Sequence, residues 1–161
     1  IAPSRPFTLD GCCGLGLILS QLPQPYVMKR KTMTFLTPYQ PQILSIFRIM
    51  SGLLLLQHGT TKILGFPASQ MSGVPITSMG GIAGVIELVF GILLVIGLFS
   101  RLSAFILSGL TAAAYFIAHM PQGFYPLLNG GELAALYSFA FLYLAAAGPG
   151  PWSVDAMRDQ S

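Results

Sequence analysis

Four long apolar stretches alternate with short turn-rich segments in the second part of the chain. They cover about residues 43–63, 79–99, 102–119 and 131–147. Each stretch has roughly the 20 residues that an α-helix needs to cross about 30 Å of hydrocarbon. The pattern therefore predicts an all-α integral membrane protein, with four spans packed as a four-helix bundle.

Proline and glycine separate these stretches. The first and third connections contain the breakers Pro67, Gly73, Pro75, Pro121, Gly123 and Pro126. Both connections are uncharged apart from Lys62 at the margin of the first. A tight turn is expected at Ser100-Arg101, and Gly148-Pro-Gly-Pro151 stops the last helix, because proline cannot continue the backbone ladder.

The composition agrees with this interpretation. Hydrophobic residues make up 53% of the 161-residue chain and charged residues only 8%, with a mean hydropathy of +0.71. A soluble domain carries about 25% charged residues to hydrate its surface. This composition argues against a soluble enzyme, a nucleic-acid-binding protein and a disordered tail, and the net charge of +3 bears on topology instead.

The basic residues near the span ends predict the orientation. One side of the membrane would carry Lys29, Arg30, Lys31, Arg101 and Arg158, whereas the other would carry Lys62 alone. Because cytoplasmic flanks carry the excess of Lys and Arg, both termini are expected in the cytoplasm. An even number of spans agrees with that.

The first 27 residues have a different character. They begin with Ile, contain four prolines and lack the ordered parts of a secretory signal. We expect that residues 1–27 are not part of the biological chain, which would begin at Met28 or Met33. The alternative is that they form a disordered extension. Cys12 and Cys13 are adjacent and have no other Cys to pair with, which excludes a C-x-x-C redox site in the membrane body. The predicted division is an extension, a basic flank, a membrane domain and a cytoplasmic tail, at 1–27, 28–42, 43–150 and 151–161.

Two helices carry polar or small residues along one face. In the first, these are Arg48, Gly52, Leu55, His58 or Gly59, and Lys62; in the second, they are Gly80, Gly84, Glu87 and Gly91. Spacings of three and four residues bring the members of each set onto one side of a helix. Ionisable groups at bilayer depth cost about 2.5–3.5 kcal/mol or more each, so their presence favours a function.

Helix depths predict that the polar residues converge in the outer half of the bundle. At about 1.5 Å per residue, Glu87 lies roughly 12 Å below the outer end of its helix, and Arg48 roughly 8 Å deeper. The other members lie at the outer ends: His58, Lys62, His119, Asn129 and Glu132.

Such a cluster can relay protons or hold the polar head of a quinone. His58, Glu87 and Glu132 are the candidates for proton handling, and Arg48, Lys62, His119 and Asn129 are the candidates for cofactor binding. We predict no metal site, although His58, His119 and a carboxylate would make an acceptable three-ligand set. The structural alternative is that Arg48 pairs with Glu87, and His58 or Lys62 with Glu132, to hold the bundle together.

These residues stand in a recognisable order. The motifs are Arg48-x-x-x-Gly52, His58-Gly-x-x-Lys62, Glu87-Leu-Val-Phe-Gly91, Ser100-Arg101, Asn129-Gly-Gly-Glu132 and Gly148-Pro-Gly-Pro-Trp152-Ser-Val-Asp155. Over residues 43–157 the chain resembles the DoxX family of small bacterial membrane proteins. The resemblance implies a four-helix, multi-pass protein of the bacterial cytoplasmic (inner) membrane. The family takes its name from a subunit of an archaeal thiosulfate:quinone oxidoreductase, and other members are associated with redox or oxidative-stress complexes.

The preferred hypothesis is therefore a membrane subunit of a quinone-linked redox system. Its expected partners are the lipid bilayer, a redox partner subunit and, in an oligomer, further copies of the chain, with no nucleic acid. A small-solute or proton-coupled carrier and a non-catalytic scaffold remain as alternatives. Arg101 and Asp155 are expected to be structural and to pair with each other at the cytoplasmic side.

Overall fold

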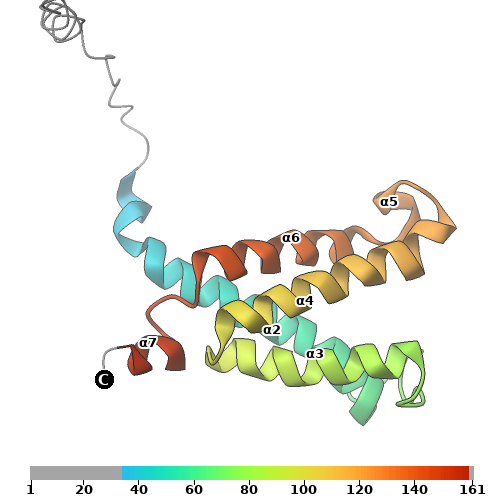
Figure 1. Ribbon diagram of the computed structural model, residues 1–161. Coiled ribbons are helices and arrows are strands. Elements are labelled where there is room, and N and C mark those ends of the chain that lie inside the picture. Colours follow the sequence, from blue (N-terminus) through green and yellow to red (C-terminus); the bar gives the residue numbers. More distant parts are fainter. Residues whose placement is uncertain (1–33, 160–161) are drawn as a thin grey trace, which may run out of the picture. The chain divides into compact units, whose positions relative to one another are not determined.

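Figure 1 shows a computed structural model of the protein, in which residues 34–159 are described. Every element in this range is helical: η1 (Thr34–Tyr39), α2 (Gln40–Leu64), α3 (Met79–Ile96), α4 (Ser100–Ala114), η2 (Tyr115–His119), η3 (Met120–Gln122), α5 (Pro126–Asn129), α6 (Glu132–Ala147) and α7 (Val154–Arg158). The predicted all-α class is confirmed. The predictions for the N-terminal extension, its two cysteines and the start at Met28 or Met33 lie outside the described residues.

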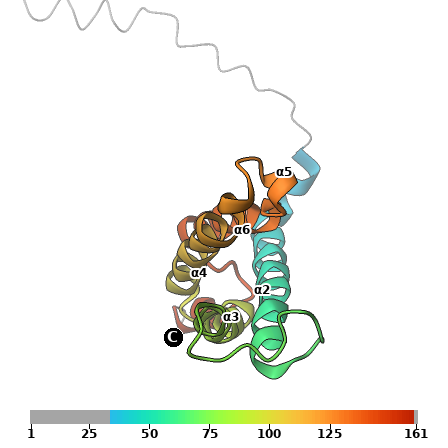
Figure 2. The ribbon, with the colours of Figure 1, turned by 90° about the vertical axis from the view of Figure 1, so that its right-hand side faces the viewer.

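The four long helices correspond to the four apolar stretches. α2 packs along α3, α4 packs along α6, and the two pairs meet through α3 with α4 and α2 with α6 (Figures 1 and 2). The apolar side chains buried between them are Leu55, Leu94, Ala104, Leu107, Phe141 and Leu144, and polar side chains such as Arg48 and Glu87 are buried as well.

Three helical segments are long and apolar enough to cross a membrane. They are Phe35–Leu64, Met79–Ile96 and Ser100–Gln122, of 30, 18 and 23 residues. The third consists of α4 continued by the π-helical turn η2 and the 3₁₀ turn η3. α6 is also apolar but has only 16 residues. The chain is therefore a membrane protein by its helices, and the fourth apolar helix lies where it is predicted but is shorter than the roughly 20 residues of a full span.

Glycine and serine set the ends of the first two long helices. Gly65 and Gly97 follow α2 and α3 in the left-handed conformation, with φ of 69° and 75°, which glycine adopts without a side-chain penalty. The Ser78 hydroxyl caps α3 by accepting from Gly81 N–H at 3.0 Å. Because α3 already ends at Ile96 and α4 begins at Ser100, the tight turn lies at 97–99, just before the predicted Ser100-Arg101.

Glycines bring α2 and α3 into close contact. A Cβ atom added at Gly59 would lie 2.7 Å from the backbone nitrogen of Leu88, and one at Gly84 would lie 2.9 Å from Lys62 Cβ. The buried face of α2 therefore contains Gly59, whereas His58 is exposed. On α3, Gly81 takes the buried position expected for Gly80. This close packing places the end of α2 against the middle of α3.

Candidate functional site

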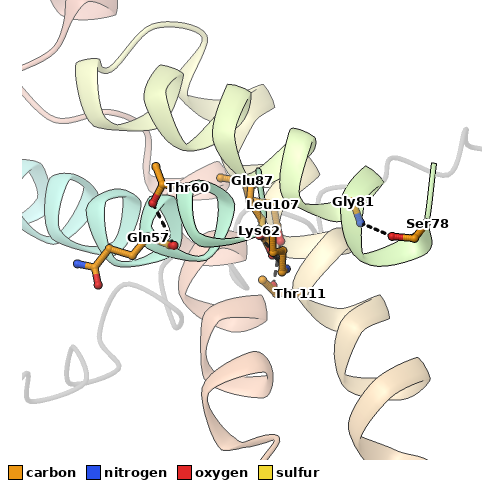
Figure 3. Close-up of polar contacts among 8 residues, drawn as sticks. All are labelled: Gln57, Thr60, Lys62, Ser78, Gly81, Glu87, Leu107 and Thr111. Atoms are coloured by element: carbon orange, nitrogen blue, oxygen red, sulfur yellow. Dashed lines mark hydrogen bonds and ion pairs between the residues drawn. The ribbon is translucent and has the colours of Figure 1, made fainter. Parts of the chain in front are cut away.

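A buried ion pair joins these two helices. Lys62 Nζ lies 2.7 Å from Glu87 Oε1 and 2.8 Å from Oε2, so the ammonium group donates to both carboxylate oxygens (Figure 3). The two side chains are only 11% and 8% exposed. The predicted pairing of Arg48 with Glu87 is therefore wrong, and Lys62 pairs with Glu87 instead of Glu132.

The local sequence explains why this pair forms. Lys62 lies in the last turn of α2, and Gly84 lies one helical turn before Glu87 on the same face of α3. With no side chain at Gly84, the stem of Lys62 can pass along α3 and bring its ammonium group to the carboxylate. Taking two charges out of water costs several kcal/mol per ion, and only close geometry with good hydrogen bonds offsets that cost. The bidentate contact supplies that geometry.

A pocket of about 200 Å³ opens beside the ion pair. Its lining comes from the end of α2 and the connection that follows: Gln57, His58, Thr61, Lys62, Pro67, Ser69 and Met71. The Thr61 hydroxyl donates to Pro67 O at 3.0 Å and so holds the connection over the helix. Lys62, Gln57 and Ser69 can donate hydrogen bonds, whereas no carboxylate lines the pocket. The lining therefore suits a ligand that accepts hydrogen bonds.

Arg48 lies in a separate polar centre toward the other end of the bundle. It is 0% exposed, and its guanidinium donates from Nε to Pro149 O at 2.9 Å and from Nη1 to Val95 O at 2.7 Å. Further hydrogen bonds go to Leu94 O and Trp152 O. Arg48 thus connects α2 with the end of α3 and with the chain that follows α6.

The residues around Arg48 complete this junction. Ser45 Oγ accepts from Trp152 N–H at 3.2 Å, and Gly150, with φ of 74°, lets the backbone pass close to Ser45. The backbone contacts of Arg48 make it a structural residue of the junction. The candidate role of Arg48 in cofactor binding is not supported by this position, because the pocket lining does not include it.

Arg101 and Asp155 do not pair with each other as predicted. Arg101 Nη1 donates to Ala145 O and Ala146 O, at 2.9 and 2.6 Å, where α6 ends. Asp155 accepts from the N–H groups of Phe99 and Ser100, at 2.9 and 2.8 Å, and so caps the start of α4. Each charge therefore stabilises the helix end with the opposite partial charge.

The environment of Asp155 also changes its acidity. Burial on its own raises the pKa of the Asp155 carboxyl. The hydrogen bonds from Ser100 and Phe99 and the positive charge of Arg158 outweigh that effect, and the pKa lies below its ordinary value.

The remaining outer residues form a second group between α4 and α6. His119 Nδ1 lies 3.1 Å from Asn129 O, and the buried Asn129 amide donates to Gly123 O and accepts from Gly131 N–H, at 2.7 and 2.8 Å. Glu132 is exposed at the start of α6. Within residues 34–159, no hydrogen bond or ion pair links this group to Lys62 or Glu87. The outer polar residues therefore form two groups, not one cluster.

The alternative metal site is not assembled either. Nowhere in the described part of the chain do three His, Cys, Asp or Glu side chains gather as a metal-binding group. The three-ligand set of His58, His119 and a carboxylate is therefore absent from residues 34–159, because the two imidazoles belong to the two separate groups.

Several residues of these sites were not singled out from the sequence. Gln57, Thr61 and Ser69 line the pocket, and Ser45 supports Arg48. Thr61 directly precedes Lys62 in the chain, and this polar side chain next to a candidate site residue could have indicated its place in the pocket. The approach of Ser69 depends on the path of the connection after α2, which helical periodicity does not describe.

The comparisons with known proteins agree with this architecture. The DoxX family model matches residues 43–120, which cover α2 from Ile43 onward and the whole of α3, α4 and η2. A relative from Haemophilus influenzae, described as an uncharacterized protein, is 45% identical over 128 residues, covering 76% of this chain and 96% of that protein. The chain belongs to the DoxX family. No solved structure matches this DoxX protein.

Proposed function

We propose that this DoxX protein is the membrane subunit of a quinone-linked redox complex in the bacterial cytoplasmic membrane. In this proposal, the pocket beside Lys62 and Glu87 holds the quinone head group. The observation that carries the proposal is the buried ion pair at the edge of a donor-lined pocket, at the end of α2, a helix long and apolar enough to cross the membrane in which quinones dissolve.

The pocket fits a quinone head group in size and chemistry. A volume of about 200 Å³ accommodates one substituted six-membered ring but little more. The two carbonyl oxygens of a quinone accept hydrogen bonds, and Gln57, Lys62 and Ser69 can supply them. Pro67 and Met71 provide apolar contact for the ring face. Gln57 and Lys62 would hold the carbonyl groups.

The ion pair gives the pocket a means of moving protons. A bound quinone takes up two electrons and two protons and leaves as the quinol. Lys62 Nζ has three hydrogens, of which two are engaged by Glu87, so the third can face a ligand. Glu87 keeps the ammonium group in place, and after Lys62 has given a proton to the quinone, the carboxylate can take up a proton from water and pass it to the Lys62 amine. His58, exposed at the pocket, is suited to exchange protons with water.

A partner must supply the electrons. The described residues form membrane helices with short connections, and none of the described groups provides a redox centre. We therefore propose a flavin- or metal-containing partner subunit as the electron donor. Glu132 has no part in this proposal, because it belongs to the second polar group.

The test is the binding of a short-chain ubiquinone to the purified protein in lipid nanodiscs. We expect the ubiquinone to raise the unfolding temperature of the unaltered protein, and Lys62→Gln or Gln57→Leu to reduce the rise strongly. His119→Gln is the matched control, since it alters the outer histidine that lies away from the pocket, and it should keep the full rise. An unaltered protein that shows no rise, or equal rises in all four proteins, would refute the pocket assignment.

A scaffold is the second candidate, favoured by one observation. Lys62 and Glu87 satisfy each other, and such a pair can act in packing alone. Replacing both residues by Met removes both buried charges together, a change that is often neutral or stabilising in other proteins. A purely structural pair therefore predicts that Lys62→Met/Glu87→Met folds and complements a deletion strain. The redox proposal predicts a folded protein that fails to complement.

A further inference from the structure

The loop between α4 and α6 presents an apolar tip. Its large side chains are among the most exposed of the molecule: Phe124 at 74%, Tyr125 at 66%, Leu127 at 73% and Leu128 at 78%. No Asp, Glu, Lys or Arg occurs anywhere in residues 102–131. Proteins rarely leave four large apolar groups together in water, because removing apolar surface from water is favourable.

Helix lengths determine the level of this tip. α4 and α6 are fastened at one end, where Arg101 donates to the last carbonyl groups of α6. From there the segment Ser100–Gln122 runs 23 residues, about 34 Å, whereas α6 has 16 residues, about 24 Å. The hydrocarbon core is about 30 Å thick. Measured from the end where Arg101 joins the two helices, residues 123–131 therefore lie between about 24 and 34 Å. With that end at one boundary of the hydrocarbon core, this interval contains the opposite boundary.

The backbone of the tip is adapted to such a position. Non-helical chain at membrane depth must satisfy its polar groups internally. The Asn129 side chain donates to Gly123 O and accepts from Gly131 N–H. Tyr115 OH donates to Phe124 O at 3.2 Å, and His119 Nδ1 contacts Asn129 O. The loop is thus folded on itself, with its apolar side chains pointing outward.

The location of the tip agrees with contact to lipid. Figure 1 shows α5 at one end of the α4 and α6 pair, and both views show it on the side away from α3 (Figures 1 and 2). Phe124 and Tyr125 form an edge-to-face pair with ring centroids 5.6 Å apart. Aromatic rings are enriched at the boundary between headgroups and acyl chains.

We infer that the segment from Phe124 to Leu128 is a membrane-inserted tip, whose side chains enter the headgroup and acyl boundary of one leaflet of the protein's own bilayer. The tip extends the short α6 to the membrane surface and fixes the depth at which α4 and α6 sit. This inference uses the membrane helices and is independent of the quinone proposal.

Tryptophan fluorescence in vesicles of phosphatidylethanolamine and phosphatidylglycerol tests the inference. In a Trp152→Phe background, a single Trp is placed at Phe124, at Leu127, at Phe139 on the exposed middle of α6, or at Asp159 in the C-terminal tail. We expect Trp at 124 and 127 to emit at shorter wavelength than Trp at 159, to resist aqueous acrylamide, and to be quenched most by lipids brominated near the headgroup. Trp at 139 should be quenched most by bromines near the chain ends.

The same measurements can overturn the inference. A tip that docks on a soluble partner, or simply lies in water, would give Trp at 124 and 127 the emission and acrylamide quenching of Trp at 159. The two tip positions are tested separately, so misfolding of one variant leaves the other to decide. Trp at 139 verifies in each preparation that the helices are embedded in lipid.

Discussion

Arg48 is buried without any carboxylate among its hydrogen-bond partners, which are four backbone carbonyl groups. We expect Arg48→Lys to destabilise the protein by about 2–4 kcal/mol, because a single ammonium group cannot reach all four acceptors, and buried acceptors left unpaired each cost about 1–3 kcal/mol. The measurement is the free energy of unfolding in detergent, with unfolding monitored by circular dichroism. Arg101→Lys is the control, since the exposed Arg101 has only two acceptors. An Arg48→Lys variant no less stable than Arg101→Lys would contradict the structural role.

The pairing of Lys62 with Glu87 shows where prediction at the residue scale ends. The sequence correctly places Arg48 and Lys62 on one face of α2, and Glu87 on a stripe of small residues in α3. Which cation meets Glu87 depends on how α2 and α3 slide along each other. The contacts at Gly59 and Gly84 set that register, and a depth estimate of 1.5 Å per residue does not contain them.

At the scale of elements, the α2–α3 contact depends on glycine. We expect Gly59→Ala to cost about 1–3 kcal/mol, because the added methyl group would meet the backbone of Leu88 at 2.7 Å and force the helices apart. Gly109→Ala on α4 is the matched control, since no atom lies within 4 Å of the added group. It should be neutral or more stable by about 0.5–1 kcal/mol, because alanine favours helix. Equal losses in thermal unfolding would contradict the packing argument.

The helices themselves were largely predictable, and the segments joining them were not. Apolar runs of about 20 residues located α2, α3, α4 and α6 to within a few residues. The short α5 was missed, because it is held by the side chain of Asn129 rather than by a hydrophobic period. The sequence predicts one cluster where the structure has two outer polar groups, one at Lys62 and Glu87 and one at His119 and Asn129. The reason is that the depth of a residue along its helix does not determine which neighbouring helix its side chain faces.

The cap that Asp155 provides to α4 should depend on pH. Its pKa is lowered in the folded state, so its stabilising effect is complete above the unfolded value of about 3.9 and is lost as the pH falls through the folded value. We expect Asp155→Asn to be less stable than the unaltered protein at pH 7, with a difference that holds to about pH 5 and shrinks below pH 4. Unfolding temperatures across this range measure it. A difference as large at pH 3 as at pH 7 would show that the cap does not act through the carboxylate charge.

At the scale of the whole molecule, the number of crossings decides the topology. Ser69 follows α2, and Asp159 follows α7, so α3, α4 and α6 lie between them. Three crossings in that interval put the two residues on opposite sides of the membrane, whereas two crossings, with a short α6 that fails to span, put them on the same side. The excess of Lys and Arg favours Asp159 on the cytoplasmic side.

Single cysteines distinguish these arrangements. With Cys12 and Cys13 replaced by Ser, Ser69→Cys and Asp159→Cys are exposed to a membrane-impermeant maleimide in intact spheroplasts and again after lysis. We expect Ser69→Cys to react in intact spheroplasts and Asp159→Cys to react only after lysis, because the 16 residues of α6 are extended to the surface by the tip around α5. Labelling of both from outside would mean that α6 does not cross. The reverse pattern would keep four crossings but invert the protein, and would place the pocket at Lys62 on the cytoplasmic side.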